Sequence, residues 1–240
     1  MVRFTLFGVP VEIQPWFWVS TALLGLMGTA GGGASAEDLR QMVIFMFAAT
    51  ISILVHEFGH ALTGTRLGGG YARVFLVAFG GFAMNEGGRF TRWQRFWMVA
   101  AGPGAGFALF LLVIGLLAIA RGPSDALGLT GQIVFGIRTA ISEETFEFFS
   151  QRLPLFSLLH SFLWINFWWS VLNLVPVLPL DGGRIAELFI RPPQRVFQVA
   201  IFAAAAVALF GLSRGSIFMA LFFGYLAWQN FQALKGIQGR

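Results

Sequence analysis

The sequence predicts an all-α polytopic membrane protein with six transmembrane helices and a short re-entrant β segment. Of its 240 residues, 57% are hydrophobic and only 11% are charged, and the mean hydropathy of +0.74 lies far outside the soluble range. Several apolar runs approach or reach the roughly 20 residues that a helix needs to cross a bilayer. Too little polar sequence remains for a second folded domain, so residues 1–240 are expected to form one membrane domain.

The positive charge of the chain is better explained by membrane topology than by nucleic acid. The formal net charge is +5 and the pI is about 11.0, but the basic residues are scattered among short loops. Cytoplasmic loops of membrane proteins carry such an excess of Lys and Arg. There is no cysteine, which excludes disulfides and thiolate metal sites. We therefore expect the lipid bilayer as a partner and no nucleic acid.

The N-terminal part is expected to form a surface hairpin followed by a first span. Residues alternate in polarity around Gly8 and Pro10, which favours a short extended segment or hairpin. The first span follows at about residues 16–30 and opens with two tryptophans suited to the membrane interface. Ala34-Ser35-Ala36 behind it resembles a signal-peptidase site. We favour a span, because the apolar run is nearly long enough to cross the bilayer.

The next two elements are a second span at about residues 42–64 and a β-prone segment at about residues 71–88. Glycines between them stop the helix. The apolar run from Val74 to Phe79 is too short to span, and irregular backbone at membrane depth must be covered by protein or water. We expect a re-entrant β hairpin with an open strand edge at Phe75–Phe82, the alternative being an interfacial loop.

The remaining chain supplies four spans and one polar stretch. Gly102-Pro103-Gly104, near the start of the third span, allows a kink and a close approach of helices. In the polar stretch at residues 121–154, isoleucines recur every four residues from Ile133 to Ile141, which predicts one amphipathic surface helix. This helix would either shield the entry to a functional site or, as we favour, be a plain connector. Spans three to six are expected at about residues 93–120, 155–178, 195–211 and 216–234.

Basic residues orient the predicted spans. Six spans place both termini on one side of the membrane, together with eleven of the sixteen Lys and Arg residues. Because the more positive side is cytoplasmic, we expect both termini in the cytoplasm.

The most informative stretch is an apolar run that contains His56-Glu57-Phe58-Gly59-His60. On a helix the two histidines share one face and can hold one Zn²⁺ ion, and Glu57 beside them can take a proton from a metal-bound water. The alternative is a pair of buried histidines that only pack and hydrogen-bond. We consider it weaker, because an intramembrane cluster of this kind is costly without a purpose.

A catalytic zinc ion usually has three protein ligands, so a third must be found. His160 lies 21 residues before Asp181, which on a helix separates them by about 30 Å and puts His160 at the opposite membrane face. Glu86 and Glu187 remain possible as the third ligand. Only Asp181 follows a helix end that two prolines should unwind, so that its side chain can turn inward.

The predicted centre therefore holds one Zn²⁺ ion per chain through His56, His60 and Asp181, near the cytoplasmic side. Glu57 is expected to activate the attacking water and to pass its proton to the leaving amine of a peptide bond. The carbonyl oxygen becomes negative in this reaction and needs a donor. Asn173 is predicted to donate to it or to hold the substrate, the alternative being a hydrogen bond between helices.

Together these motifs resemble the site-2 protease family of intramembrane zinc metalloproteases. The resemblance covers most of the chain and is strongest in the ordered pair of zinc motifs. It rests on His56-Glu57-Phe58-Gly59-His60, Asn173-x-x-Pro176-x-x-Pro179-Leu180-Asp181-Gly182, Gly81-Phe-Ala-Met-Asn85, and the opening Leu6-Phe7-Gly8-Val9-Pro10-Val11, which is similar to that of small prokaryotic members.

The resemblance implies a three-helix catalytic core, formed by the second to fourth spans, that cleaves transmembrane protein substrates within or near the bilayer. It also implies a prokaryotic inner membrane and a role in regulated intramembrane proteolysis. We expect neither a PDZ-like insertion nor a cystathionine-synthase-like domain. By resemblance the residue roles are zinc binding by His56, His60 and Asp181, catalysis by Glu57 and Asn173, and substrate binding by Asn173, Gly81 and Asn85.

One departure and two competing functions remain. Gly106 stands where many members of the family carry an asparagine in the third span. A transporter or binding protein with a vestigial zinc site would also contain broken helices and buried polar residues, but it would not need Glu57. A prenyl-protein endopeptidase would be expected to supply a downstream glutamate ligand in place of Asp181.

Overall fold

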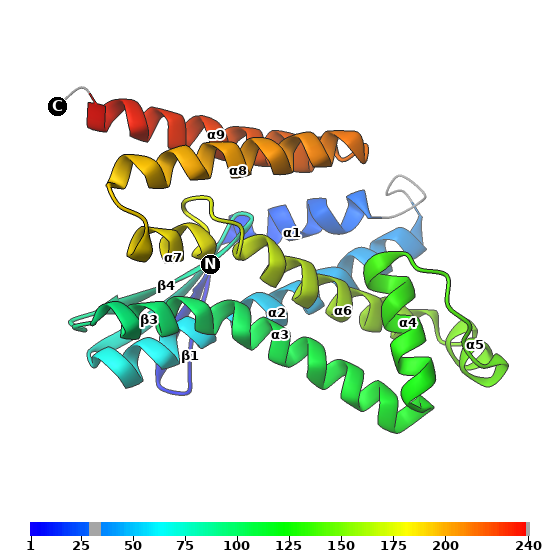
Figure 1. Ribbon diagram of the computed structural model, residues 1–240. Helices are drawn as coiled ribbons and strands as arrows, with labels where there is room; N and C mark the ends of the chain where they lie inside the picture. The colour runs from blue at the N-terminus through cyan, green and yellow to red at the C-terminus, as the bar shows by residue number, and fades with distance from the viewer. Residues whose placement is uncertain (29–34, 239–240) are drawn as a thin grey trace.

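The computed structural model describes residues 1–28 and 35–238, and the protein is mainly helical with one small sheet (Figure 1). The helices α2 (Ala36–Gly68), α3 (Arg92–Arg121) and α6 (Leu153–Asn173) pack against one another, as expected for the three-helix core. The helices α8 (Pro193–Ser213) and α9 (Ile217–Gln238) form an antiparallel pair along one side of the other helices (Figure 1). The sheet lies at the end of the molecule where α2 ends and α3 begins (Figure 1).

The sheet joins two hairpins that are far apart in the sequence. Strands β1 (Val2–Leu6) and β2 (Val9–Ile13) form the predicted N-terminal hairpin, and β3 (Tyr71–Val77) and β4 (Gly80–Glu86) form the second one. β2 and β3 pair in parallel, which gives the order β1-β2-β3-β4. The expected open edge therefore belongs to β4 alone, because β3 is paired on both sides within the described residues.

Among the residues that the structure describes, four helices are long and apolar enough to cross a membrane, which indicates a membrane protein. They correspond to predicted spans two to five and are α2 (Ala36–Gly68), α3 (Arg92–Arg121), α6 (Leu153–Asn173) and α8 (Pro193–Ser213). The first expected span coincides with α1 (Pro15–Met27), a shorter apolar helix of 13 residues, and its last residues, 29–30, lie outside the described residues. The sixth coincides with α9 (Ile217–Gln238), which is not among these four, so crossing of the membrane by α1 and α9 stays a prediction.

The helix α2 begins six residues before the predicted start because Ser35 caps it. The Ser35 hydroxyl accepts a hydrogen bond from the Asp38 backbone N–H at 3.0 Å, and the Asp38 carboxylate accepts one from the Ser35 N–H at 3.2 Å. This reciprocal pair satisfies two backbone donors at the helix start. Ala34, the first residue of the possible signal-peptidase site, lies outside the described residues.

The prediction of a single amphipathic helix in the polar stretch is wrong, because α4 (Pro123–Phe135) and α5 (Glu143–Ser150) are separate helices. Gly136 adopts a left-handed conformation with φ of 65° and ends α4. Asp125 joins the two helices by accepting hydrogen bonds from the Ser142 hydroxyl, the Thr145 hydroxyl and the Ser142 N–H. These bonds, that of the Ser142 hydroxyl above all, hold the pKa of Asp125 below its ordinary value.

The proline-rich segment after α6 breaks the helix, as its sequence indicates. α6 ends at Asn173, earlier than the predicted limit at residue 178. A loop over residues 174–180 follows, and a further helix, α7 (Asp181–Phe189), then begins at Asp181. The first turn of α7 packs tightly against this loop, since a Cβ atom at Gly182 would lie 2.1 Å from the carbonyl oxygen of Leu174. This close packing fixes where the Asp181 side chain begins.

Candidate metal centre

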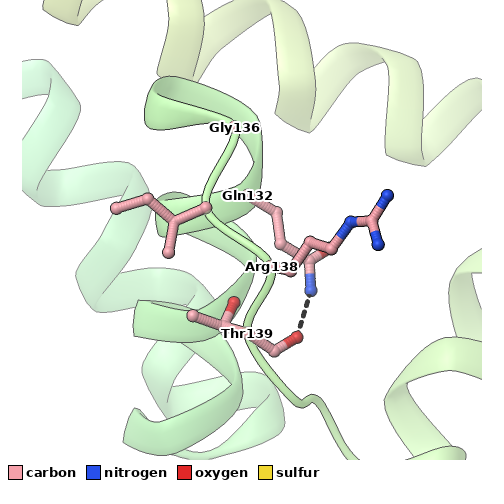
Figure 2. Close-up of a pocket in the computed structure, with 5 residues that line it drawn as sticks. Gln132, Gly136, Arg138 and Thr139 are labelled. Carbon is pink, nitrogen blue, oxygen red and sulfur yellow. Dashed lines mark hydrogen bonds between the residues drawn. The ribbon is translucent and has the colours of Figure 1, made fainter.

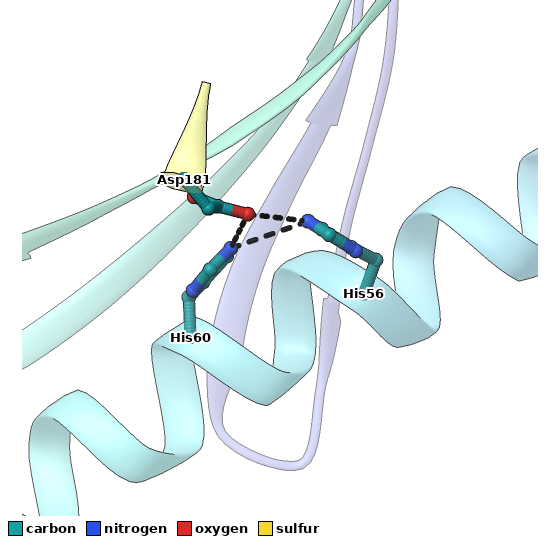
Figure 3. Close-up of side chains that lie close together, drawn as sticks. All are labelled: His56, His60 and Asp181. Carbon is teal, nitrogen blue, oxygen red and sulfur yellow. Dashed lines mark hydrogen bonds and ion pairs between the residues drawn. The ribbon is translucent and has the colours of Figure 1, made fainter. Parts of the chain in front are cut away.

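Three predicted ligands converge from two distant segments. His56 and His60 project from one face of α2 toward the carboxylate of Asp181 at the start of α7 (Figure 3). The Asp181 Oδ2 atom lies 3.1 Å from His56 Nε2 and 3.2 Å from His60 Nε2, and the two Nε2 atoms are 3.3 Å apart. All three residues are buried. Among the described residues they form a group of potential metal-binding side chains.

The spacing of the three atoms fits a zinc ion. Ligands about 2.0–2.1 Å from a tetrahedral Zn²⁺ ion lie about 3.3 Å from one another. The three observed separations of 3.1, 3.2 and 3.3 Å are close to that value. Asp181 also lies in the first turn of α7, where the helix dipole favours its negative charge. Two histidines and a carboxylate are a ligand set that zinc accepts.

The hydrogen bonding of His60 supports the same conclusion. Its Nδ1 atom lies 2.9 Å from the carbonyl oxygen of Met98 in α3, so Nδ1 must donate. In the neutral imidazole Nε2 then carries a lone pair, and this lone pair faces the Asp181 carboxylate at 3.2 Å. Two acceptors at this distance repel each other, so a cation must lie between them, either a metal ion or the proton of an imidazolium. The Met98 carbonyl also orients the ring, as partners of metal-bound histidines commonly do.

Glu57 is buried next to the histidines and against the sheet. A Cβ atom at Gly81 of β4 would lie 2.8 Å from Glu57 Cγ and 3.0 Å from Glu57 Oε1. The strand β4 therefore passes directly beside the carboxylate, and only glycine leaves room for it there. This contact brings one of the predicted substrate-binding residues next to the predicted base.

The third helix contributes a close contact whose role sequence reasoning missed. A Cβ atom at Gly102 of α3 would lie 2.1 Å from His60 Nε2, so the imidazole occupies the space that a side chain would need. The Gly-Pro-Gly sequence does indicate a close approach of helices. It does not indicate that the neighbouring group is His60, nor that Met98, one turn earlier, accepts the hydrogen bond of that ring.

The two predicted asparagines bond to residues outside the group of potential ligands. Asn173, at the end of α6, donates to the carbonyl oxygen of Trp169 in its own helix at 2.9 Å. Asn85 of β4 contacts the sulfur of Met98 at 3.6 Å and packs against Gly64 of α2. The buried Oδ1 atom of Asn85 has no hydrogen-bond partner among the described residues. Their contacts with a substrate stay predictions.

The departure at Gly106 has a packing reason. A Cβ atom at this position of α3 would lie 2.2 Å from the hydroxyl oxygen of Ser170 in α6. The buried Ser170 hydroxyl thus fills the space that an asparagine side chain would enter. Glycine at 106 and serine at 170 together allow α3 and α6 to approach closely.

The other candidate ligands lie outside the metal-binding group. His160 is exposed and packs against the ring of Phe156. Glu86 accepts a hydrogen bond from the Tyr71 hydroxyl, and Glu187 is exposed. Of the residues considered for the third position, Asp181 is therefore the one that the fold brings to the histidine pair.

A surface pocket of about 350 Å³ lies away from these residues, at the end of α4 (Figure 2). Gln132, Gly136, Ile137, Arg138 and Thr139 line it, and the Gln132 amide donates to the Thr139 carbonyl oxygen at 2.6 Å. It contains none of the predicted site residues. The residues suited to metal chemistry thus lie in the buried cluster of α2 and α7.

The fold and the site define a helical membrane protein with a buried His-His-Asp centre. A model of peptidase family M50 matches residues 44–212, more than half of the chain, so the chain belongs to this family. A solved structure, the site-2 protease from Methanocaldococcus jannaschii, superposes with a TM-score of 0.54 at 20% identity, covering 96% of this chain and 94% of that one. The resemblance to site-2 proteases found in the motifs is thereby confirmed.

Two curated relatives are named as metalloproteases. The chain is 28% identical to a candidate zinc metalloprotease of Synechocystis and 23% identical to a zinc metalloprotease of Methanocaldococcus jannaschii. Both matches cover 76% of this chain. The matched parts make up 42% and 43% of the relatives, so the chain spans less than half the length of either protein.

Proposed function

We propose that the chain is an intramembrane zinc metalloprotease that hydrolyses peptide bonds of transmembrane protein substrates within or near the bilayer. The observation that carries this proposal is the convergence of His56, His60 and Asp181, with Glu57 buried beside them. Membership of peptidase family M50 and two relatives named as metalloproteases support it. In this proposal residues 1–240 work as one protease domain, and the reaction serves regulated intramembrane proteolysis.

His56, His60 and Asp181 would hold the zinc ion. When bound, the ion supplies Lewis-acid chemistry that polarises a peptide carbonyl and makes water more acidic. Glu57 takes a proton from the attacking water and returns it to the leaving amine. Its burial excludes bulk solvent from that proton transfer. Asn173, at the end of α6, would hold the substrate or donate to the carbonyl oxygen as its negative charge develops.

The sheet offers a way to present an unwound substrate. A spanning helix hides its peptide bonds in its own hydrogen bonds, so it must unwind locally before attack. An extended segment can then pair with the open edge of β4 by strand addition. Gly81 lies on this strand directly beside Glu57, and Asn85 lies four residues further along. Pairing at this edge would bring a substrate peptide bond close to the base.

The proposed topology has six spans, with α1 and α9 as the first and last, in a prokaryotic inner membrane. Both termini and the metal centre then face the cytoplasm. Because the chain has no cysteine, single cysteines can be introduced without a background. A membrane-impermeant thiol reagent is expected to label a cysteine at Arg3 only after the cells are opened, and one at Ser213 in intact spheroplasts. The reverse pattern would contradict the orientation.

The function is tested by cleavage of a single-span substrate by the purified chain in liposomes. Cleavage within or near the span is expected to fall to background after treatment with a zinc chelator and to return on addition of Zn²⁺, because the ion supplies the Lewis acid. The control is an equal amount of heat-denatured protein, which gives the cleavage that does not depend on the folded chain. Cleavage that persists in the protein from which zinc has been removed would exclude the proposed chemistry, and zinc binding without any cleavage of a panel of spans would favour a binding protein.

A further inference from the structure

The last helix contacts the loop that carries Asp181 through one buried polar side chain. Asn230 of α9 is 2% exposed, and its Nδ2 atom donates to the carbonyl oxygens of Leu178 and Leu226, each at 2.8 Å. Leu226 lies one turn earlier in α9, whereas Leu178 lies three residues before Asp181 in the loop between α6 and α7. Asn230 therefore links two separate parts of the fold.

The chemistry of the partners fixes the orientation of this amide. Both partner atoms are carbonyl oxygens, which only accept hydrogen bonds. An exchange of the amide nitrogen and oxygen would turn Oδ1 toward both carbonyls and lose both bonds. Asn230 thus uses its two N–H groups at once, one within its helix and one toward the loop.

Beyond its first residues, which bond to the end of α6, the described loop has few backbone hydrogen bonds. Pro176 and Pro179 have no backbone N–H group to donate. Two hydrogen bonds lie within the loop, from the Val177 N–H to the Val175 carbonyl oxygen at 2.7 Å and from the Leu180 N–H to the Val177 carbonyl oxygen at 2.8 Å. The Leu178 carbonyl takes part in neither of them. In the protein interior an unpaired carbonyl is costly, and Asn230 supplies its partner.

Side-chain packing around the Asn230–Leu178 hydrogen bond also joins α9 to the loop, but a pocket remains on one side. Val177 of the loop packs against Phe223 and Leu226 of α9 in one buried cluster. On the other side, Leu178, Pro179 and Asn230 border a pocket of about 200 Å³. The Leu178 backbone also packs against Gly183 of α7, so a shift of Leu178 toward this space is expected to move the start of α7 with it.

We propose that Asn230 is a positioning residue of the metal centre. Its bond to Leu178 fixes the loop, and the loop fixes the first residue of α7, so the position of the Asp181 carboxylate depends on α9. This inference rests on the proposed metal site. Asn230 also lies outside residues 44–212, which the family model matches, so it extends the functional unit to the last helix.

The test measures metal binding and loop protection in the full chain, without reference to cleavage. Asn230→Leu is compared with Gln232→Leu, which makes the same apolar change at an exposed position of the same helix. Co²⁺ is titrated into each protein in detergent, its visible absorption is recorded, and affinity is measured by competition with a chelator. Hydrogen–deuterium exchange of residues 174–183 is followed in the metal-free proteins.

In Asn230→Leu we expect about tenfold weaker Co²⁺ binding, altered visible bands and faster exchange in the loop, with α2 unchanged. Gln232→Leu should match the wild type. Equal affinity and equal loop exchange in the two variants would overturn the inference. If the wild type binds no Co²⁺ at the histidines, the proposed metal site fails first and this inference fails with it.

A second variant decides the matter if Asn230→Leu does not fold. Asn230→Asp keeps the size of the side chain but can donate at most one hydrogen bond, and only when protonated, so it cannot satisfy both carbonyl oxygens. Faster exchange of residues 174–183 and weaker Co²⁺ binding are expected here too. Wild-type values for both quantities would overturn the inference.

Discussion

Replacing Glu57 by glutamine is expected to lower the rate of peptide cleavage by about 10²–10⁴-fold while zinc stays bound. Glutamine has nearly the same shape but cannot take a proton from water. Glu57 is not among the three side chains that converge as potential ligands, so the metal site should survive. Single-turnover cleavage of a labelled single-span substrate measures the rate, and the zinc content of the purified protein is measured in parallel.

The matched control is Glu187→Gln, which removes the same charge from an exposed position of α7. It should cleave at the wild-type rate. A Glu57→Gln protein that keeps its zinc and still cleaves at the wild-type rate would remove Glu57 from the mechanism. If instead zinc is lost together with cleavage, Glu57 acts on metal binding and the assignment of a separate base is wrong.

The histidine pair was predictable because its geometry is local. Residues four apart on one helix share a face whatever the rest of the fold does, so His56 and His60 could be placed from spacing alone. Asp181 needed one further step. Pro176 and Pro179 follow the end of α6 at Asn173 and remove backbone donors that a longer helix would need, and this predicts a turn before Asp181. The sequence does not predict that a new helix, α7, starts at that residue.

The features of the fold that could not be predicted depend on contacts between residues far apart in the sequence. β2 and β3 are separated by more than fifty residues and by two helices, and their parallel pairing, for example Val11 with Val74, has no local pattern. Regular spacing also misled us in the polar stretch, where the isoleucine repeat crosses Gly136. The left-handed conformation of that glycine ends α4. The repeat is therefore divided between α4 and the loop after it, and does not form one helix.

Local sequence patterns and distant contacts also differ in how far they could be predicted inside the site. Gly102 and Gly106 belong to one small-residue segment, and the sequence indicates only that other helices come close to it. The fold assigns the two neighbours differently, because Gly102 meets the ring of His60 and Gly106 meets the hydroxyl of Ser170. A single segment of α3 thus sets the position of a predicted ligand on one side and the distance to α6 on the other.

Replacing Asp181 by alanine is expected to weaken zinc binding by more than about 100-fold, because a ligand matters more than the outer hydrogen bonds whose loss costs about 10–100-fold. Cleavage should be lost as well. The change also removes the negative charge between two imidazole nitrogens that lie 3.3 Å apart. Chelator competition measures the affinity, and circular dichroism checks that the helices are kept.

Comparison with Glu57→Gln separates the two roles that the site requires. One variant should keep the metal and lose the chemistry, whereas the other should lose both. Asp181→Asn refines the test, since it keeps the shape of the side chain but not its charge, and it should bind zinc more weakly than the wild type. An Asp181→Ala protein with wild-type zinc affinity would mean that the two histidines and another group hold the ion, and α7 would then have no part in the centre.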